Sequence, residues 1–103
     1  MQGNTQRLFS GSTTGPGDTH DDPVKCRFSK EATFYLDITA IAGSLDIEIQ
    51  TYNPLTDNWH KLAVFDTKTT ICQDEGFIEY GIGEKLAIEY DGTATFTLDV
   101  HLK

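Results

Sequence analysis

The histidines and clustered acids of this chain are the residues that could hold a metal, and their spacing does not match a known site. His20, His60 and His101 form neither an HxH nor an HExxH arrangement, the spacings that bring two imidazoles to one ion. Residues 18–22 offer oxygen ligands, but they lack the calcium-loop pattern that ends in a bidentate Glu. We therefore predict no metal site and no cofactor, and we interpret residues 18–22 as a solvated acidic linker.

Residues suited to catalysis are present, but they stand in no arrangement that predicts a reaction. Ser, His and Asp occur without a GxSxG elbow. The glycines of residues 11–17 are not followed by the Gly-Lys-Ser/Thr sequence of a phosphate-binding loop. Asp74, Glu75 and Glu79 could supply a carboxylate pair, but such acids are more typical of a solvated strand edge that discourages aggregation. We therefore expect that the chain is not an enzyme.

The aromatic residues leave two interpretations open. Tyr35 and Tyr52 fall on the polar faces of their predicted strands, and Trp59 opens a strand after a turn. Large aromatic side chains most often pack in cores or interfaces, and this is the favoured interpretation. The alternative is a carbohydrate-binding face in which Tyr35, Tyr52 and Trp59 point toward a ligand.

The composition argues against several classes of partner. The 103 residues contain 8 basic and 16 acidic side chains, which give a net charge of -8. Nucleic acids and anionic membranes are bound by cationic surfaces, so we expect neither as a partner. No stretch approaches the roughly 20 apolar residues of a membrane span. The first residues lack the basic and apolar regions of a secretory signal, so we expect synthesis in the cytosol.

The two cysteines, Cys26 and Cys72, stand alone without a CxxC partner. Reduced, partly buried thiols are the favoured interpretation, and whether the two are bridged is left open because a pairing cannot be deduced from sequence.

Residues 1–23 differ in composition from the rest of the chain. Residues 10–18 contain no large apolar side chain, so they cannot bury enough surface to offset the entropy lost on ordering. We predict a flexible, extended N-terminal arm over residues 1–23, followed by a folded domain over residues 24–103. The adjacent Leu8 and Phe9 are interpreted as a docking anchor on this arm.

From Val24 onward apolar and polar residues alternate, which is the period of a strand with one buried face. Breakers such as Ala42-Gly43-Ser44, Asp74-Glu75-Gly76 and Asp91-Gly92 separate the alternating runs and are typical of turns. The expected strands lie near residues 25–28, 33–41, 45–52, 59–65, 69–72, 77–80, 85–90 and 93–102. Strands with one apolar face must cover it with a second sheet, so we predict an all-β antiparallel β-sandwich or small jelly-roll-like barrel.

The order of these features resembles a family of proteins. Residues 33–40 (TFYLDITA) lead through Gly43 to residues 45–50 (LDIEIQ), followed by a polar turn, Trp59, residues 86–90 (LAIEY), Asp91-Gly92 and residues 95–100 (TFTLDV). Over about residues 33–102 this resembles the small β-sandwich proteins of tailed-bacteriophage virions, which decorate or cement capsids or form parts of heads and tails.

The resemblance implies a non-enzymatic virion structural protein, most simply a capsid decoration or cement protein. Its implied partner is the major capsid protein or another virion protein, and a homo-oligomer, with a trimer favoured, is expected in the virion. Arg7, Leu8 and Phe9 would then be the partner-binding residues of the arm. A carbohydrate-binding module and a tail or head-completion protein are the alternatives.

Overall fold

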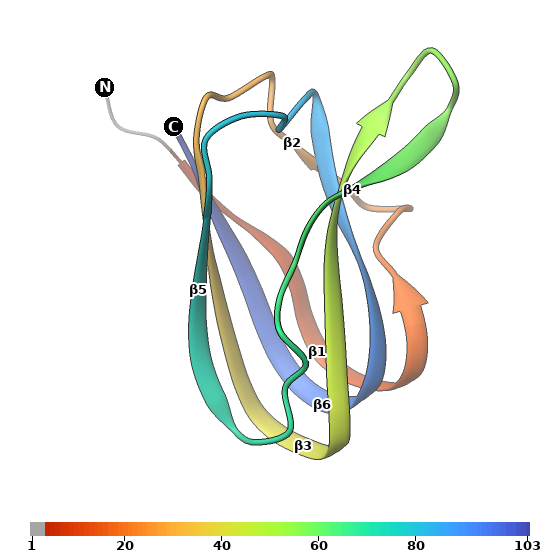
Figure 1. Ribbon diagram of the computed structural model, residues 1–103, viewed down its shortest axis with the longest axis vertical. Helices are drawn as coiled ribbons and strands as arrows, with labels where there is room; N and C mark the ends of the chain where they lie inside the picture. The colour runs from red at the N-terminus through yellow and green to blue at the C-terminus, as the bar shows by residue number, and fades with distance from the viewer. Residues whose placement is uncertain (1–3) are drawn as a thin grey trace.

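The structure, a computed structural model, describes residues 4–103, and within them the chain forms six β-strands and no helix. All strand pairings are antiparallel (Figure 1). The strands are β1 (Asn4–Asp18), β2 (Val24–Lys25), β3 (Ala32–Asn53), β4 (Asn58–Val64), β5 (Cys72–Ile78) and β6 (Lys85–Leu102). The prediction of an all-β antiparallel fold is confirmed.

Strands β3 and β6 are long and run through both layers of the molecule. They pair over nearly their whole length, from Ala32↔Leu102 to Thr51↔Leu86, and the register shifts near the middle. Figure 1 shows the long strands curving together at the lower end of the molecule. The single six-stranded sheet is thereby folded onto itself and forms a β-sandwich.

Gly92 permits this bend. It lies opposite Leu45 of β3, and its φ is +152°. A Cβ atom at this position would lie 2.3 Å from the carbonyl oxygen of Ser44. A residue without a Cβ is therefore required where the two backbones approach.

The bend divides the sheet into two layers. The first layer contains β5 with the beginning of β3, the end of β6 and the beginning of β1; the second contains β4 and β2 with the remaining halves of the long strands. Alternate side chains of both layers meet between them. The largest fully buried ones are Phe34, Leu36, Ile38, Leu45, Ile47, Ile49, Ile82, Leu86, Ile88, Phe96, Leu98 and Val100. Each contributes about 1.5–3 kcal/mol through burial.

The structure corrects the predicted arm. Residues 4–18 form β1, which pairs with β6 from Asn4↔Leu102 to Asp18↔Glu89. Backbone hydrogen bonds hold this strand, so it needs few large apolar side chains. Thr13, 6% exposed, donates a hydrogen bond to the carbonyl of Gly92. The division at residue 23 is therefore replaced by one domain that includes β1. Residues 1–3 lie outside the described residues, and the structure does not bear on the expectation that the chain lacks a secretory signal.

Three of the predicted turns are also corrected. The segments 42–44, 74–76 and 91–92 lie inside β3, β5 and β6, respectively. Neighbouring strands stay paired across each of them, so the backbone bends or continues instead of reversing. The expected pairs of short strands at 33–41 and 45–52, and at 85–90 and 93–102, are therefore single long strands. β5 replaces the expected strands at 69–72 and 77–80.

Cys26 and Cys72 are both free thiols. No helix in residues 4–103 has the length and hydropathy needed to cross a membrane. The same residues contain no cluster of three or more His, Cys, Asp or Glu side chains that could hold a metal ion.

Candidate functional site

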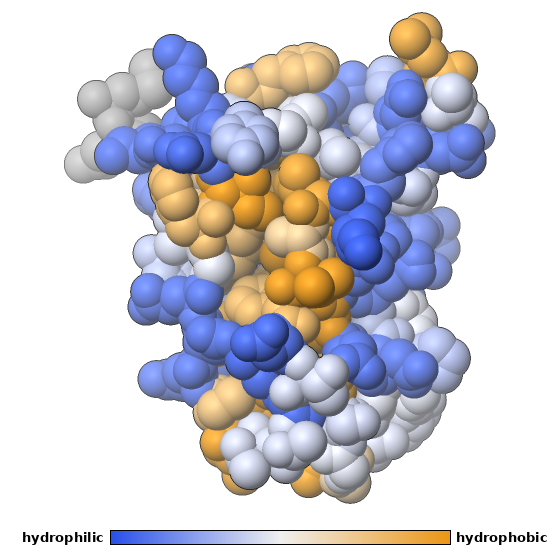
Figure 2. All heavy atoms as spheres, in the orientation of Figure 1, coloured by the Kyte–Doolittle hydropathy of each residue, from blue (hydrophilic) through white to orange (hydrophobic). Residues whose placement is uncertain are grey.

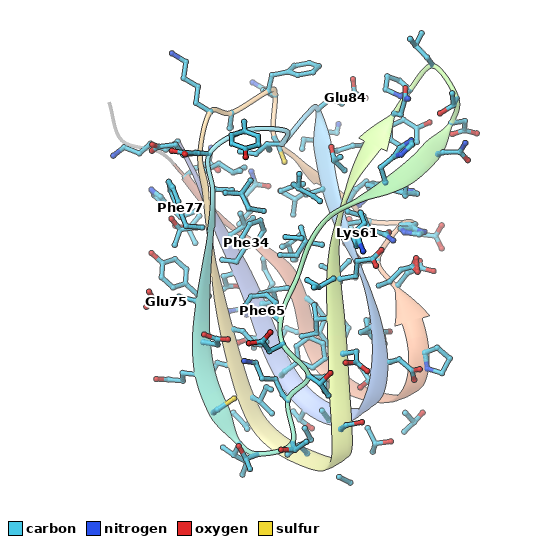
Figure 3. All side chains as sticks on the ribbon, in the orientation of Figure 1. Phe34, Lys61, Phe65, Glu75, Phe77 and Glu84 are labelled. Carbon is cyan, nitrogen blue, oxygen red and sulfur yellow. The ribbon has the colours of Figure 1, made fainter. Side chains whose placement is uncertain are left out.

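The outer face of the first layer combines two exposed aromatic rings with a field of polar side chains. Tyr35 of β3 is 44% exposed and Phe77 of β5 is 57% exposed. Figure 3 shows Phe77 and Glu75 on the outer side of β5, while Phe34 and Phe65 point toward the interior. We call this surface the aromatic face. It consists of Thr5, Arg7, Ser10, Thr33, Tyr35, Asp37, Gln73, Glu75, Phe77, Thr97, Asp99 and His101.

Strand register sets these side chains in rows across four strands. The central row runs from Arg7 through Asp99 and Tyr35 to Glu75, because each residue is paired with the next. One neighbouring row contains Thr5, His101, Thr33 and Phe77, and the other contains Ser10, Thr97, Asp37 and Gln73. Rows in a sheet are separated by two residues along each strand, or about 7 Å. The two rings therefore lie on adjacent strands in adjacent rows.

A shallow hollow of about 390 Å³ lies at the centre of the aromatic face. Tyr35 lines it together with Arg7, Asp37, Gln73 and Thr97. These side chains supply both donors and acceptors of hydrogen bonds. The hollow thus offers an apolar ring surrounded by polar groups, an arrangement that suits a ligand with apolar C–H faces and many hydroxyls.

Arg7 and Asp99 form a two-point ion pair on this face. Nε of Arg7 donates to Oδ1 of Asp99 at 2.9 Å, and Nη2 donates to Oδ2 at 3.3 Å. The hydrogen bond and the charge of Asp99 raise the pKa of the Arg7 guanidinium. The pair fixes both side chains beside Tyr35, so the face is ordered before any ligand arrives.

The three residues predicted to bind a partner, Arg7, Leu8 and Phe9, do not lie on one surface. Arg7 lies on the aromatic face, whereas Leu8 is 5% exposed and belongs to the core. Phe9 stacks on Phe96 with ring centroids 4.5 Å apart and packs against Tyr90 at 5.2 Å. A bulge between Arg7 and Phe9 turns Leu8 and Phe9 inward together. The expected anchor on a free arm is therefore corrected, because both apolar side chains are used inside their own domain.

The predicted ligand-facing aromatics are divided between the layers. Tyr52 and Trp59 lie on the second layer, away from Tyr35, because β3 bends between Tyr35 and Tyr52. Trp59 stacks on His20 with centroids 4.8 Å apart and packs against Tyr52 at 5.1 Å. The amino group of Lys85 lies 4.1 Å from the centre of the Tyr52 ring. These side chains cover one another, so Tyr52 and Trp59 are only half-buried packing residues of a local stack.

A hydrogen-bond network continues from this stack. Gln50 is 4% exposed, and its amide oxygen accepts a hydrogen bond from Nε2 of His20 at 2.6 Å. Its amide nitrogen donates to Glu48 at 2.6 Å and to Glu89 at 2.7 Å. An amide oxygen can only accept, so His20 carries its proton on Nε2 in this contact. The network ties the turn after β1 to β3 and β6.

Phe77 was missed by sequence reasoning, because residues 72–78 (CQDEGFI) do not alternate between apolar and polar types. Gln73, Glu75 and Phe77 alternate with residues of lower exposure along β5, which places Phe77 on the outer face. The Gly76 beside it suggested a turn, and this interpretation separated Phe77 from its strand. The pairing of β5 with β3 is what places Phe77 on the face of Tyr35.

An apolar groove lies between β4 and β5, where the two layers open. It has a volume of about 350 Å³ and is lined by Phe34, Ile49, Val64, Phe65 and Ile78 together with the acidic residues Asp66, Asp74 and Glu75. Figure 2 shows an apolar patch over this part of the surface. Val64 is 59% exposed, and β4 and β5 are each paired with β3 alone within the described residues. Each of these strands therefore has a free edge.

The chain is similar to known proteins in fold but not in sequence. No protein-family model and no curated protein sequence matches the chain. The SPBc2 prophage-derived protein YomS is similar in structure, with a TM-score of 0.62 and 9% identity over 98% of this chain and 93% of YomS. The PBSX exported protein XepA gives a TM-score of 0.68 and 6% identity over 96% of this chain, which spans 36% of XepA.

Carbohydrate-binding modules share the fold as well. A mutant of a family 29 carbohydrate-binding module gives a TM-score of 0.52 and 9% identity over 98% of this chain and 92% of the module. At such identities the likeness defines a fold, that of an antiparallel β-sandwich found in prophage proteins and carbohydrate-binding modules.

Proposed function

We propose that the chain is a non-enzymatic, glycan-binding module of a phage-type structural protein. The observation that carries this proposal is the exposure of Tyr35 and Phe77 beside each other on a flat sheet face, surrounded by hydrogen-bonding side chains. Sugar rings present C–H faces that stack on aromatic rings, while their hydroxyls pair with carboxylates, amides and guanidinium groups. The aromatic face offers both in a hollow open to solvent.

The absence of catalysis is part of the proposal. Glycoside hydrolysis requires two carboxyl groups on opposite sides of the scissile bond, one of which an apolar environment keeps protonated. Glu75 is exposed and Asp37 is half-buried on an open face, so neither lies in an apolar environment of that kind. Such a surface suits holding a sugar chain rather than cleaving it.

The likeness to YomS, XepA and a carbohydrate-binding module supports both parts of the proposal. A phage particle must recognise the surface of its host, and a small β-sandwich with a glycan-binding face would suit that task. A location in the virion is part of the same proposal.

Binding to immobilised polysaccharides and to a glycan array tests the proposal. We expect Tyr35→Ala and Phe77→Ala each to weaken binding about fivefold, because an aromatic contact contributes about 1 kcal/mol. Phe28→Ala is the matched control, since Phe28 is 71% exposed but lies outside the aromatic face. The proposal fails if wild-type protein binds no glycan, or if the control variant loses as much affinity as the other two.

Capsid decoration is a second candidate function, and the apolar groove favours it. A groove with exposed Val64 and two free strand edges could receive an apolar segment of the major capsid protein or another virion protein. We expect Val64→Asp to abolish co-sedimentation with undecorated capsids, whereas Leu55→Asp, at a 94% exposed position, leaves it intact. Equal binding by both variants would exclude the groove. Sedimentation velocity tests the trimer expected for such a protein.

A further inference from the structure

The carboxylates of the aromatic face are not balanced by cations. Asp37, Glu75 and Asp99 belong to the face, and Arg7, its one guanidinium, is paired with Asp99. Within residues 4–103, the side chains of Asp37 and Glu75 have neither a salt bridge nor a hydrogen bond to another side chain or to the backbone. Two negative charges are therefore available to a ligand.

These two carboxylates lie on two sides of Tyr35. Glu75 is directly opposite Tyr35 on β5, and Asp37 follows two residues later on the same face of β3. The Cβ atoms of directly opposite residues are about 5 Å apart, and those two residues apart on one strand are about 7 Å apart. A sugar ring stacked on Tyr35 would therefore bring its substituents within reach of both acids.

Charge then decides which substituents are favoured. An ammonium group on the sugar would form charge-assisted hydrogen bonds with Glu75 or Asp37, and its charge would also be attracted to the face of Tyr35. A sugar carboxylate, sulfate or phosphate would instead be repelled by both acids. The net charge of -8 on the whole chain acts in the same direction at long range.

We propose that the aromatic face selects glycans with free amino groups, such as de-N-acetylated glucosamine polymers, over N-acetylated and acidic glycans. This inference rests on the proposed glycan-binding function and assigns a ligand class to the same site. Tyr35 and Phe77 supply the stacking surface, and Glu75 and Asp37 supply the selectivity.

Two hexasaccharides with the same β-1,4 backbone test the proposal by isothermal titration calorimetry: one of glucosamine and one of N-acetylglucosamine. The buffer is set at about pH 5.5, which lies above the ordinary pKa of a carboxyl group and keeps the amino groups of the glucosamine hexamer protonated. We expect the wild-type protein to bind the glucosamine hexamer about five- to tenfold more tightly than the N-acetylglucosamine hexamer, because two solvent-screened charge pairs contribute affinity of about that size. Salt at about 1 M, where the Debye length is about 3 Å, should remove most of this preference.

Variants separate the local acids from the overall charge. The double variant with Glu75→Gln and Asp37→Asn should bind both hexamers alike. The control with Asp21→Asn and Asp22→Asn loses the same charge at exposed positions in the turn after β1, and it should keep the preference.

The outcomes also separate this inference from the proposed function. Equal binding of both hexamers by wild-type protein, or a preference that the Glu75 and Asp37 substitutions leave unchanged, would overturn the selectivity while glycan binding stands. Binding of neither hexamer, together with no signal from any glycan on the array, would overturn both.

Discussion

Leu8 links the stability of the whole domain to one side chain of β1. It is 5% exposed within the hydrophobic core, so its removal leaves a cavity in that core. We expect Leu8→Ala to lower the free energy of unfolding by about 2–4 kcal/mol, as measured by urea denaturation. Leu55→Ala, at a 94% exposed position, should change it by less than about 0.5 kcal/mol. A free anchor at Leu8 would instead predict small effects for both.

Burial makes the two thiols chemically different. It raises the pKa of Cys26 to about 11 from an ordinary value of 9.0, and the thiol is 3% exposed. The thiolate is the reactive form, so iodoacetamide should label the half-buried Cys72 well before Cys26 in the folded protein, as measured by mass spectrometry. Equal labelling rates would contradict the buried position of Cys26.

The same shift predicts a dependence of stability on pH. Above pH 9 the unfolded thiol ionises while the folded Cys26 thiol keeps its proton until about pH 11. The folded state then binds more protons than the unfolded state, so the free energy of unfolding falls as the pH rises through this range. Cys26→Ala should reduce that part of the decline.

At the scale of the strand, local patterns predicted those elements that have a clear apolar face. The alternation over residues 33–52 and 85–102 correctly indicated strands with one buried side. β1 escaped prediction because residues 10–18 contribute backbone hydrogen bonds and small side chains rather than apolar area. Whether such a segment pairs depends on the free edge of β6, which lies more than 70 residues further along the chain.

Glycine at position 92 has two local interpretations, a tight turn or a bend in a continuous strand, and the sequence favoured the wrong one. Because a Cβ atom here would lie 2.3 Å from Ser44 O and 2.9 Å from Leu45 Cα, backbone atoms would have to move. We expect Gly92→Ala to lower the free energy of unfolding by about 3 kcal/mol or more.

Gly76→Ala provides the control for this substitution. Gly76 lies in the interior of β5, and a Cβ atom there would make ordinary contacts, at 3.7 Å from the ring of Phe65. We expect a change within about 0.5 kcal/mol by the same denaturation measurement. A similar loss for both variants would mean that the bend does not depend on Gly92.

At the scale of the whole molecule, the candidate site depends on contacts distant in sequence. Its central row takes Arg7 from β1, Asp99 from β6, Tyr35 from β3 and Glu75 from β5. The polar position of Tyr35 within its own strand was predictable from alternation. Its neighbours were not, because strand order and register are set by tertiary packing. The separation of Tyr35 from Tyr52 and Trp59 likewise follows from the bend of β3.

The bent strands should also make the two layers unfold together. β3 and β6 supply paired residues to both layers, and one core cluster includes side chains from each. Opening one layer would therefore expose the apolar side of the other and break the long strands at the bend. A single cooperative transition is expected, without an intermediate in which one layer persists.

Two optical probes of urea unfolding test this expectation. Fluorescence of Trp59 reports on the second layer, and far-ultraviolet circular dichroism reports on the strands of both. In a double variant, Trp59→Phe with Phe77→Trp, fluorescence would report on the first layer instead. In each protein the fluorescence and dichroism curves should coincide. A fluorescence change that precedes the dichroism change in either protein would show that one layer opens alone, and the bent strands would then act as a hinge between separable halves.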